Sequence, residues 1–258
     1  MAGPLLQEQI ARCASWPQRF PPEQWSIYKQ VMHQARQRNV PFAVGGGLAA
    51  MTYAGQWRNT KDIDLYVLPR DRDQMIAIVA SLGLADYYEK QAYDRQWIYR
   101  SHKDDTIVDI MWAMANHRAQ VDEAWLNGPE VQAGDECFRL LAAEEELWSK
   151  LYLMQRDRCD WPDAVNLLYG VGPQLDWRHL ISRVAEDRAL LAGLLSLFSW
   201  LHPERARELP AWIWRELQLS APVEAGGLEL ARNRARLLDS RPWFTPALDK
   251  KEKEVTQC

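Results

Sequence analysis

The stretch of sequence that decides the fold is residues 42–67, FAVGGGLAAMTYAGQWRNTKDIDLYV. It has the composition of a strand, a glycine turn, a short helix, a basic loop and a second strand over residues 62–67. Asp62 and Asp64 lie two residues apart on that second strand, so both carboxylates point to the same face. Paired carboxylates bind divalent metals, and backbone N–H groups at the start of a helix bind phosphate. The stretch therefore predicts metal-assisted chemistry on a nucleoside triphosphate.

This arrangement resembles the nucleotidyltransferase superfamily that includes polymerase beta. Members of that superfamily have a Gly-Gly or Gly-Ser turn, then a D-x-D strand, then a third acidic residue on a later strand. Here the turn is Gly45-Gly46-Gly47, and the strand carries Asp62-Ile63-Asp64. Either neighbouring pair of glycines can be the family pair, and the serine hydroxyl of many relatives is absent, which leaves phosphate binding to backbone amides. The resemblance implies an enzyme with an α+β fold and a mixed-sheet nucleotidyltransferase core.

A narrower likeness lies in residues 55–64, GQWRNTKDID. They are similar to the G-x-x-R-x-T-x-D-I-D run of small bacterial nucleotidyltransferases akin to the toxin of type IV abortive-infection toxin–antitoxin pairs. This likeness implies a toxin–antitoxin or defence role, with an antitoxin protein as a partner. Arg58 and Lys61 are candidates to stabilise the triphosphate or the acceptor electrostatically, with a solvated surface pair as the alternative. Thr60 is expected to brace the loop by a local side-chain bond, and all three join the glycines in the predicted nucleotide-binding set.

The third acidic residue is predicted to be Asp109, in the apolar strand TIVDIMW. A lone acid there can also face the solvated side of a sheet, and Asp104 and Asp105 in the preceding turn are rivals for its role. Nucleotidyl transfer uses two metal ions about 3.5–4 Å apart to stabilise the attacking and leaving oxygens. Asp62, Asp64 and Asp109 are therefore the predicted catalytic and metal-binding residues of a two-ion Mg²⁺ site, in which Asp109 assists deprotonation of the acceptor.

A further candidate is Lys150, in EELWSKLYLMQRDR, which is followed by Asp160 and Asp163. This segment resembles the helical K…R…D segment that follows the core in the toxin-like proteins. The resemblance implies that the lysine binds nucleotide. A helix-surface lysine is the alternative, and Arg156 or Arg158 can take the same role.

The composition limits the class of protein. The chain has 258 residues and a net charge of −4, which argues against a general nucleic-acid coat protein but leaves room for a local basic patch that binds tRNA. Its four cysteines are scattered, and no signal peptide is visible, so we expect reduced thiols in a cytoplasmic protein with no membrane attachment. The apolar run over residues 189–201 is expected to be a buried helix. The histidines form no zinc-binding pattern, and no Walker-type loop or G-x-S-x-G elbow is present.

The hydrophobic pattern predicts two domains. Residues 1–135 are expected to form the nucleotidyltransferase core, and residues 136–258 a C-terminal helical domain. The core has an N-terminal helix over about residues 23–38, after an irregular segment at residues 1–20. A strand pair joined by a polar turn is expected within residues 96–112.

The sequence as a whole predicts a Mg²⁺-dependent nucleotidyltransferase that transfers an NMP from ATP or another NTP to an acceptor. The acceptor is a tRNA, a protein or a small molecule, and the sequence does not choose among them. One alternative is a non-catalytic nucleotide-binding regulatory module. Another is an antibiotic nucleotidyltransferase with acids lining the acceptor pocket. Glu144, Glu145 and Glu146 are candidates for those acids, although such a run is usually a solvated helix face.

Overall fold

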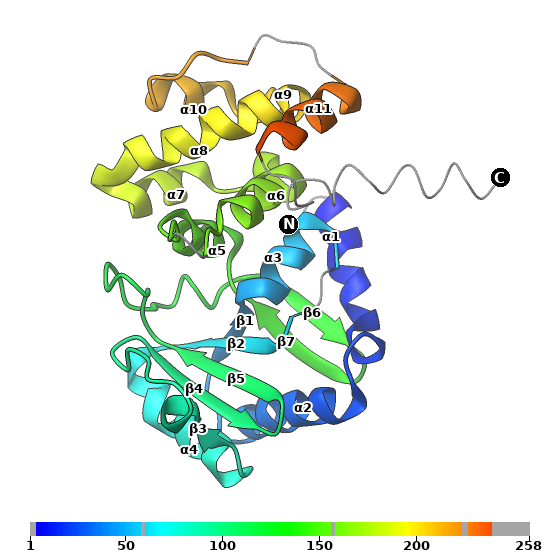
Figure 1. Ribbon diagram of the computed structural model, residues 1–258, viewed down its shortest axis with the longest axis vertical. Helices are drawn as coiled ribbons and strands as arrows, with labels where there is room; N and C mark the ends of the chain where they lie inside the picture. The colour runs from blue at the N-terminus through cyan, green and yellow to red at the C-terminus, as the bar shows by residue number, and fades with distance from the viewer. Residues whose placement is uncertain (1–3, 58–59, 156–157, 223–226, 239–258) are drawn as a thin grey trace, which may run out of the picture. The chain divides into compact units, whose positions relative to one another are not determined.

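The computed structural model describes residues 4–57, 60–155, 158–222 and 227–238. Contacts between residues divide the chain into two compact units: Met1–Thr52 with Trp57–Glu146, and Tyr53–Gln56 with Leu147–Cys258. All the strands that the structure describes belong to the first unit, and the elements described in the second are helices (Figure 1).

The first unit is built on a mixed sheet of seven strands. These are β1 (Phe42–Gly45), β2 (Asp62–Val67), β3 (Ala85–Asp86), β4 (Ile98–Lys103), β5 (Thr106–Met111), β6 (Glu130–Ala133) and β7 (Glu136–Leu140). Their order across the sheet is β3-β4-β5-β2-β1-β7-β6. β1 and β2 are antiparallel, as are β4 and β5, whereas β5 is parallel to β2 and β7 is parallel to β1. The predicted α+β fold with a mixed-sheet core is therefore confirmed.

The strand β2 forms because its side chains alternate between two environments. Asp62 and Asp64 are half-buried on one face, whereas Ile63 and Leu65 are buried on the other. This period of two fixes the direction in which the acids point, since a slip of one residue would bury the acids and expose the apolar side chains.

Two helices, α2 (Pro22–Gln37) and α4 (Arg72–Ser81), pack against each other and against β5. α2 begins with a proline in its first turn, where the missing N–H costs nothing. Its buried face is the one that the helical period predicts, namely Trp25, Tyr28, Val31, Met32 and Ala35. α4 adds Met75, Ile78 and Val79 to this core.

The described residues near the N-terminus are helical, so the expectation of an irregular segment is wrong. α1 (Pro4–Ala11) is followed by a short 3-10 helix, η1 (Arg12–Gln18). Cys13 and Trp16 of η1 are buried, and the ring of Trp16 lies 5.6 Å from that of Phe138. Tertiary packing of this kind stabilises a segment whose own sequence shows only a weak helical period.

The sheet continues beyond residue 135, where the sequence was expected to become helical. β7 pairs antiparallel with β6 and parallel with β1. Phe138 and Leu140 are buried and Arg139 between them is exposed, which is the period of a strand. Placing residues 136–140 in the helical domain is therefore wrong, because this short alternation of buried and exposed side chains forms the strand β7, and the helical pattern begins only after it. The division into two domains itself stays a prediction.

The elements described in the second unit are helices. They are α5 (Ala143–Leu151), whose first residues belong to the first unit, α6 (Trp161–Val171), α7 (Trp177–Val184), α8 (Arg188–Leu201), α9 (Pro203–Ala206), α10 (Ala211–Glu216) and α11 (Leu228–Leu238). The apolar run over residues 189–201 lies in α8 and buries one face of it, as expected. Among the residues that the structure describes, no helix combines the length and the apolar character needed to cross a membrane.

We predict that Ile78→Ala lowers the free energy of unfolding by about 2–5 kcal/mol, because it opens a cavity beneath the sheet at a fully buried side chain. Chemical denaturation followed by far-UV circular dichroism measures this change. The matched control is Ile76→Ala on the same helix, where the side chain is only half-buried. It should cost less than half as much, and equal losses in the two variants would contradict the packing described for α4.

Candidate active site

Four neighbouring strands bring a row of residues into register across the sheet. Asp64 of β2 lies directly beside Asp109 of β5 in the parallel pair. On the two flanks, Arg100 of β4 faces Asp109, and Gly45 of β1 faces Asp64. Residues in register on adjacent strands project to the same face. The sheet itself therefore gathers a cation, two acids and a glycine in one line.

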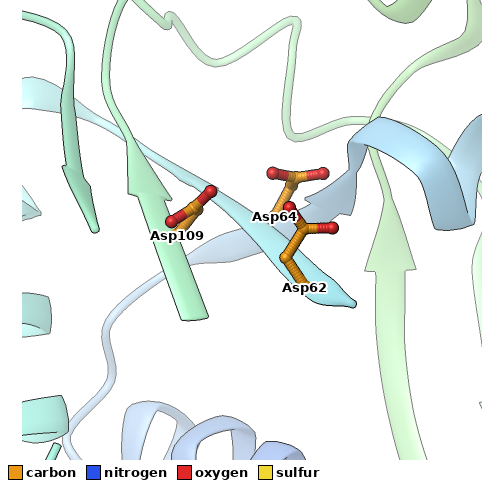
Figure 2. A group of neighbouring side chains, drawn as sticks. All are labelled: Asp62, Asp64 and Asp109. Atoms are coloured by element: carbon orange, nitrogen blue, oxygen red, sulfur yellow. The ribbon is translucent and has the colours of Figure 1, made fainter. Parts of the chain in front are cut away.

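Asp62, two residues before Asp64, adds a third carboxylate to this face. One oxygen from each of Asp62, Asp64 and Asp109 lies within 4.8 Å of the other two. Figure 2 shows the three carboxylates gathered on one side of β2 and β5. The structure thus brings together the three residues that the sequence assigns to metal binding.

The burial of these acids decides between the alternatives for the third carboxylate. Asp109 is only 1% exposed, so the alternative in which it faces solvent is wrong. Its rivals Asp104 and Asp105 are exposed in the turn between β4 and β5. Asp109 is therefore the third acid of the group.

The chemistry of this group fits a hard divalent cation. All three donors are carboxylate oxygens, which are the ligands that Mg²⁺ prefers. Three negative charges so close together repel one another unless a cation compensates them. The group can hold Mg²⁺ without any sulfur or nitrogen ligand.

The glycine turn touches the acids closely. β1 ends at Gly45, and helix α3 (Gly46–Ala54) begins at the next residue. A Cβ on Gly45 would lie 2.3 Å from the ring of Tyr66. Gly46 has φ +58°, and a Cβ there would lie 1.7 Å from Oδ2 of Asp64. Only glycine satisfies both positions, because the backbone of the turn packs directly on the side chains of β2.

The amide of Gly46 already has a partner within the protein. Its N–H donates to Oε2 of Glu146 over 3.0 Å. Glu145 and Glu146 are both fully buried, so the expectation of a solvated helix face is wrong for these two acids. The predicted nucleotide-binding roles of Gly45, Gly46 and Gly47 stay predictions, and a phosphate would have to compete with Glu146 for this amide.

The loop before β2 contacts the acids through Thr60. Its hydroxyl donates to Oδ1 of Asp62 over 2.7 Å, so it orients a carboxylate as well as the backbone. Lys61 has an exposed side chain. Arg58 lies outside the described residues. The nucleotide-binding roles of Arg58, Thr60 and Lys61 stay predictions.

Helix α2 supports the start of β2 through Tyr28. The Tyr28 hydroxyl accepts from Gln24 over 2.6 Å and lies 3.4 Å from the carbonyl of Lys61. Burial raises the pKa of Tyr28 well above its ordinary value; the bond from Gln24 partly opposes this, and the negative charges of the three acids add to it. The hydroxyl therefore keeps its proton and remains a donor toward Lys61.

Arg100 is a residue of this site that the sequence interpretation missed. Its Nε lies 2.9 and 3.1 Å from the two oxygens of Asp109, and its Nη2 lies 2.5 Å from Oδ2. The same Nη2 is 3.8 Å from Oδ2 of Asp62. Hydrogen bonds to Asp109 raise the pKa of Arg100, burial opposes this, and the charges of the acids raise it further. Arg100 is therefore a permanent positive charge among the carboxylates.

A signal for Arg100 was present in the sequence. The strands β4 and β5 form a hairpin whose turn is Asp104-Asp105, with Lys103 paired to Thr106. Counting back from this turn places Arg100 opposite Asp109, because antiparallel partners keep a constant sum of residue numbers. The polar turn alone predicts the strand pair, and the register that follows from the turn predicts the partner of Asp109.

Lys150 lies in the helical unit and is buried, so the alternative of a surface lysine is wrong. Its Nζ donates to Oδ2 of Asp160 over 3.2 Å and to Oδ2 of Asp163 over 3.0 Å. Burial alone would raise the pKa of Asp160, but the charges and hydrogen bonds of Lys150 and Arg158 outweigh burial and lower it. The role of Lys150 in nucleotide binding stays a prediction, and Arg156 lies outside the described residues.

Comparison with known proteins identifies the family. Residues 25–201 match a protein family described as uncharacterised nucleotidyltransferases. The chain belongs to this nucleotidyltransferase family. The match spans the glycine turn, the three acids and Lys150, and it makes the protein a transferase enzyme. No curated protein matches this nucleotidyltransferase.

Solved structures similar to this nucleotidyltransferase include an antibiotic-resistance factor and an antibiotic adenylyltransferase. The antibiotic-resistance factor ANT(2'')-Ia is 21% identical, with a TM-score of 0.47, and the match covers 69% of this chain and 98% of that one. The lincosamide antibiotic adenylyltransferase LnuA is 16% identical, with a TM-score of 0.40, covering 55% and 94%. JHP933 from Helicobacter pylori is 15% identical, with a TM-score of 0.39, covering 91% and 96%.

We expect Gly46→Ala to destabilise this nucleotidyltransferase and to weaken its binding of Mn²⁺, because the new Cβ must displace the carboxylate of Asp64. The left-handed backbone adds a cost of about 1–2 kcal/mol. Thermal unfolding and electron paramagnetic resonance of free Mn²⁺ measure the two effects. Gly83→Ala is the matched control, because Gly83 also has a positive φ, of +79°, but the nearest atom to its new Cβ is 3.8 Å away. Equal effects on Mn²⁺ binding would contradict the close contact at Gly46.

The ion pairs of Lys150 lead us to expect that the stability of the protein depends on pH. The folded pKa of Asp160 is lowered, so the stabilisation is present at neutral pH and is lost as the pH falls below about 4, the ordinary value for aspartate. Lys150→Met should therefore be less stable than wild type at pH 7, and the gap in unfolding free energy should shrink toward pH 3. Lys103→Met removes an exposed lysine and should show no such pH-dependent gap. A difference in unfolding free energy between Lys150→Met and wild type that did not change with pH would contradict the pairing of Lys150 with Asp160.

Proposed function

We propose that the protein is a Mg²⁺-dependent enzyme that transfers an NMP from ATP or another NTP to an acceptor molecule. The observation that carries this proposal is the convergence of Asp62, Asp64 and Asp109 on one face of the sheet. The glycine turn packs against one of these acids, which supports a site for metal and triphosphate together.

The reaction is a displacement at the α-phosphorus of the nucleotide. A hydroxyl oxygen of the acceptor, or a similar nucleophile, forms the new bond to phosphorus and loses its proton. The bond between the α-phosphorus and the oxygen leading to the β-phosphorus breaks, and pyrophosphate leaves with that oxygen. Negative charge on the transferring phosphoryl group and on the leaving group is what the site must stabilise.

The residues of the site take separate parts in this proposal. Asp62 and Asp64 would hold Mg²⁺, and Asp109 would complete the ligand set on the acceptor side. Bound Mg²⁺ neutralises charge on the phosphate oxygens of the nucleotide. Thr60 fixes the orientation of Asp62 through its hydrogen bond. Asp62, once fixed in this way, needs no rearrangement when the nucleotide arrives.

Basic side chains and backbone amides would bind the triphosphate. The amides of the glycine turn are the backbone donors, and Arg58 and Lys61 supply positive charge in the loop before β2. Lys150 is proposed as a further nucleotide-binding residue, by the resemblance of its segment to the toxin-like proteins.

The proposal has three forms, which differ in the acceptor. The acceptor is a tRNA, a protein side chain, or a small molecule such as an antibiotic. The resemblance of the run GQWRNTKDID to the toxin-like proteins supports a toxin–antitoxin or defence role, with an antitoxin protein as the partner. The proposed location is the cytoplasm. Fold alone does not select the acceptor, because one fold carries many specificities. The test of the proposal therefore supplies the protein with all three classes of acceptor.

We predict that purified protein transfers label from an α-³²P-labelled NTP to one of these acceptors in the presence of Mg²⁺. Asp62→Asn combined with Asp64→Asn should lower the rate by more than about 100-fold, the scale of one lost electrostatic contact to a transition state. The matched control is Asp104→Asn combined with Asp105→Asn, which removes the same charge from the nearby turn and should leave the rate within about twofold, the scale of a surface substitution.

The identity of the labelled product names the acceptor class. Label in RNA, in protein or in an added aminoglycoside would each select one form of the proposal. NTP binding without transfer to any acceptor would instead favour a non-catalytic nucleotide-binding module. Equal loss in the two double variants would remove the proposed role of Asp62 and Asp64.

A further inference from the structure

Arg100 lies where it can compete with a metal ion for the third acid. Its guanidinium contacts both oxygens of Asp109, through Nε at 2.9 and 3.1 Å and through Nη2 at 2.5 Å. The Nη2 atom is also 3.8 Å from Oδ2 of Asp62. Asp109 is almost wholly buried, whereas the side chain of Arg100 is 32% exposed. The buried acid is thus held by a partly exposed cation that contacts two of the three carboxylates.

The charges of the group set the consequence of this contact. Three ionised carboxylates carry three negative charges, and Arg100 compensates one of them. The two negative charges that remain are balanced by one divalent cation. A second divalent ion that shares Asp109 would lie close to the guanidinium, and like charges at such distances in a partly buried site repel strongly. Both oxygens of Asp109 are also already accepting hydrogen bonds from Arg100.

We propose that Arg100 is a resident counter-cation that withholds Asp109 from metal in the free protein. The first ion is then held by Asp62 and Asp64, and Asp109 becomes a ligand only when Arg100 releases it. This inference rests on the proposed function, because it assumes that the three acids form the metal site. It makes Arg100 a positioning residue, one that acts through Asp109 and sets the order in which the site is filled.

If Arg100 assists metal binding instead of opposing it, the expected change in metal affinity has the opposite sign. If Arg100 instead holds Asp109 in the orientation that metal needs, removing Arg100 weakens metal binding. If Arg100 competes with metal, removing it tightens binding. The sign of the change in metal affinity therefore decides between the two, with no need for an assay of transfer.

The test measures Mn²⁺ binding to the full chain, without nucleotide, by electron paramagnetic resonance of free Mn²⁺. Arg100→Gln should tighten Mn²⁺ binding by about tenfold or more, since it removes a like charge beside the site. Arg100→Lys keeps the charge but loses the two-point contact, and it should give a smaller tightening. Arg95→Gln is the matched control: Arg95 is 54% exposed and pairs with Asp86, so the variant should change affinity by less than about twofold.

A second readout follows from stability. Without metal, Arg100→Gln removes a cation that pairs with a buried carboxylate, so the melting temperature of the variant should fall below that of wild type. Added Mn²⁺ should then raise the melting temperature of Arg100→Gln by more than it raises that of wild type. Adding Asp109→Asn should abolish the gain in affinity that Arg100→Gln brings. Should Arg100→Gln not fold, Arg100→Lys carries the same comparison.

The outcomes separate this inference from the proposed function. Unchanged or weaker Mn²⁺ binding in the Arg100 variants overturns the inference but leaves the metal site standing. Tighter binding that persists in the Asp109→Asn background also overturns it. Absence of Mn²⁺ binding from wild type and from both Arg100 variants overturns the inference together with the proposed metal site.

Discussion

The parallel ladder between β2 and β5 places Asp64 beside Asp109, and the remainder of the site depends on this register. A shift of one residue along β5 would turn Asp109 to the opposite face and bring Val108 or Ile110 into its place. The apolar residues that alternate with the acids resist that shift, because Ile63, Val108 and Ile110 are buried in the core. The hydrophobic effect thus fixes the position of the charges.

The protein compensates its own charges at this face of the sheet. Arg100 lies against the acids, and the carboxylate of Glu146 accepts from the amide of Gly46. One side chain thus supplies positive charge to the carboxylates, and another supplies an anion to the start of α3. A buried charge is costly unless it is paired. In the free protein, internal ion pairs and hydrogen bonds therefore offset that cost. A ligand must form more favourable contacts to displace them.

Much of the fold and part of the site could be predicted from sequence, for reasons that differ by residue. The strand, glycine turn, helix and second strand of residues 42–67 are local, and the period of two at Asp62 and Asp64 is visible by itself. Arg100 was within reach, because a hairpin turn fixes its partner. Glu146 was not, since it lies a hundred residues from Gly46, and no local pattern encodes that contact. The strand at residues 136–140 was missed because its alternation is short.

The contact between the glycine turn and β2 has a consequence for the gene. All glycine codons begin with GG, so any change in those bases replaces the residue. At position 45 a replacement meets the ring of Tyr66, and at position 46 it meets the carboxylate of Asp64. In these neighbouring codons only the third base can change without replacing the glycine. Random mutagenesis of the coding sequence, followed by selection for folded and active protein, would therefore reveal this turn as a short interval of purely synonymous variation.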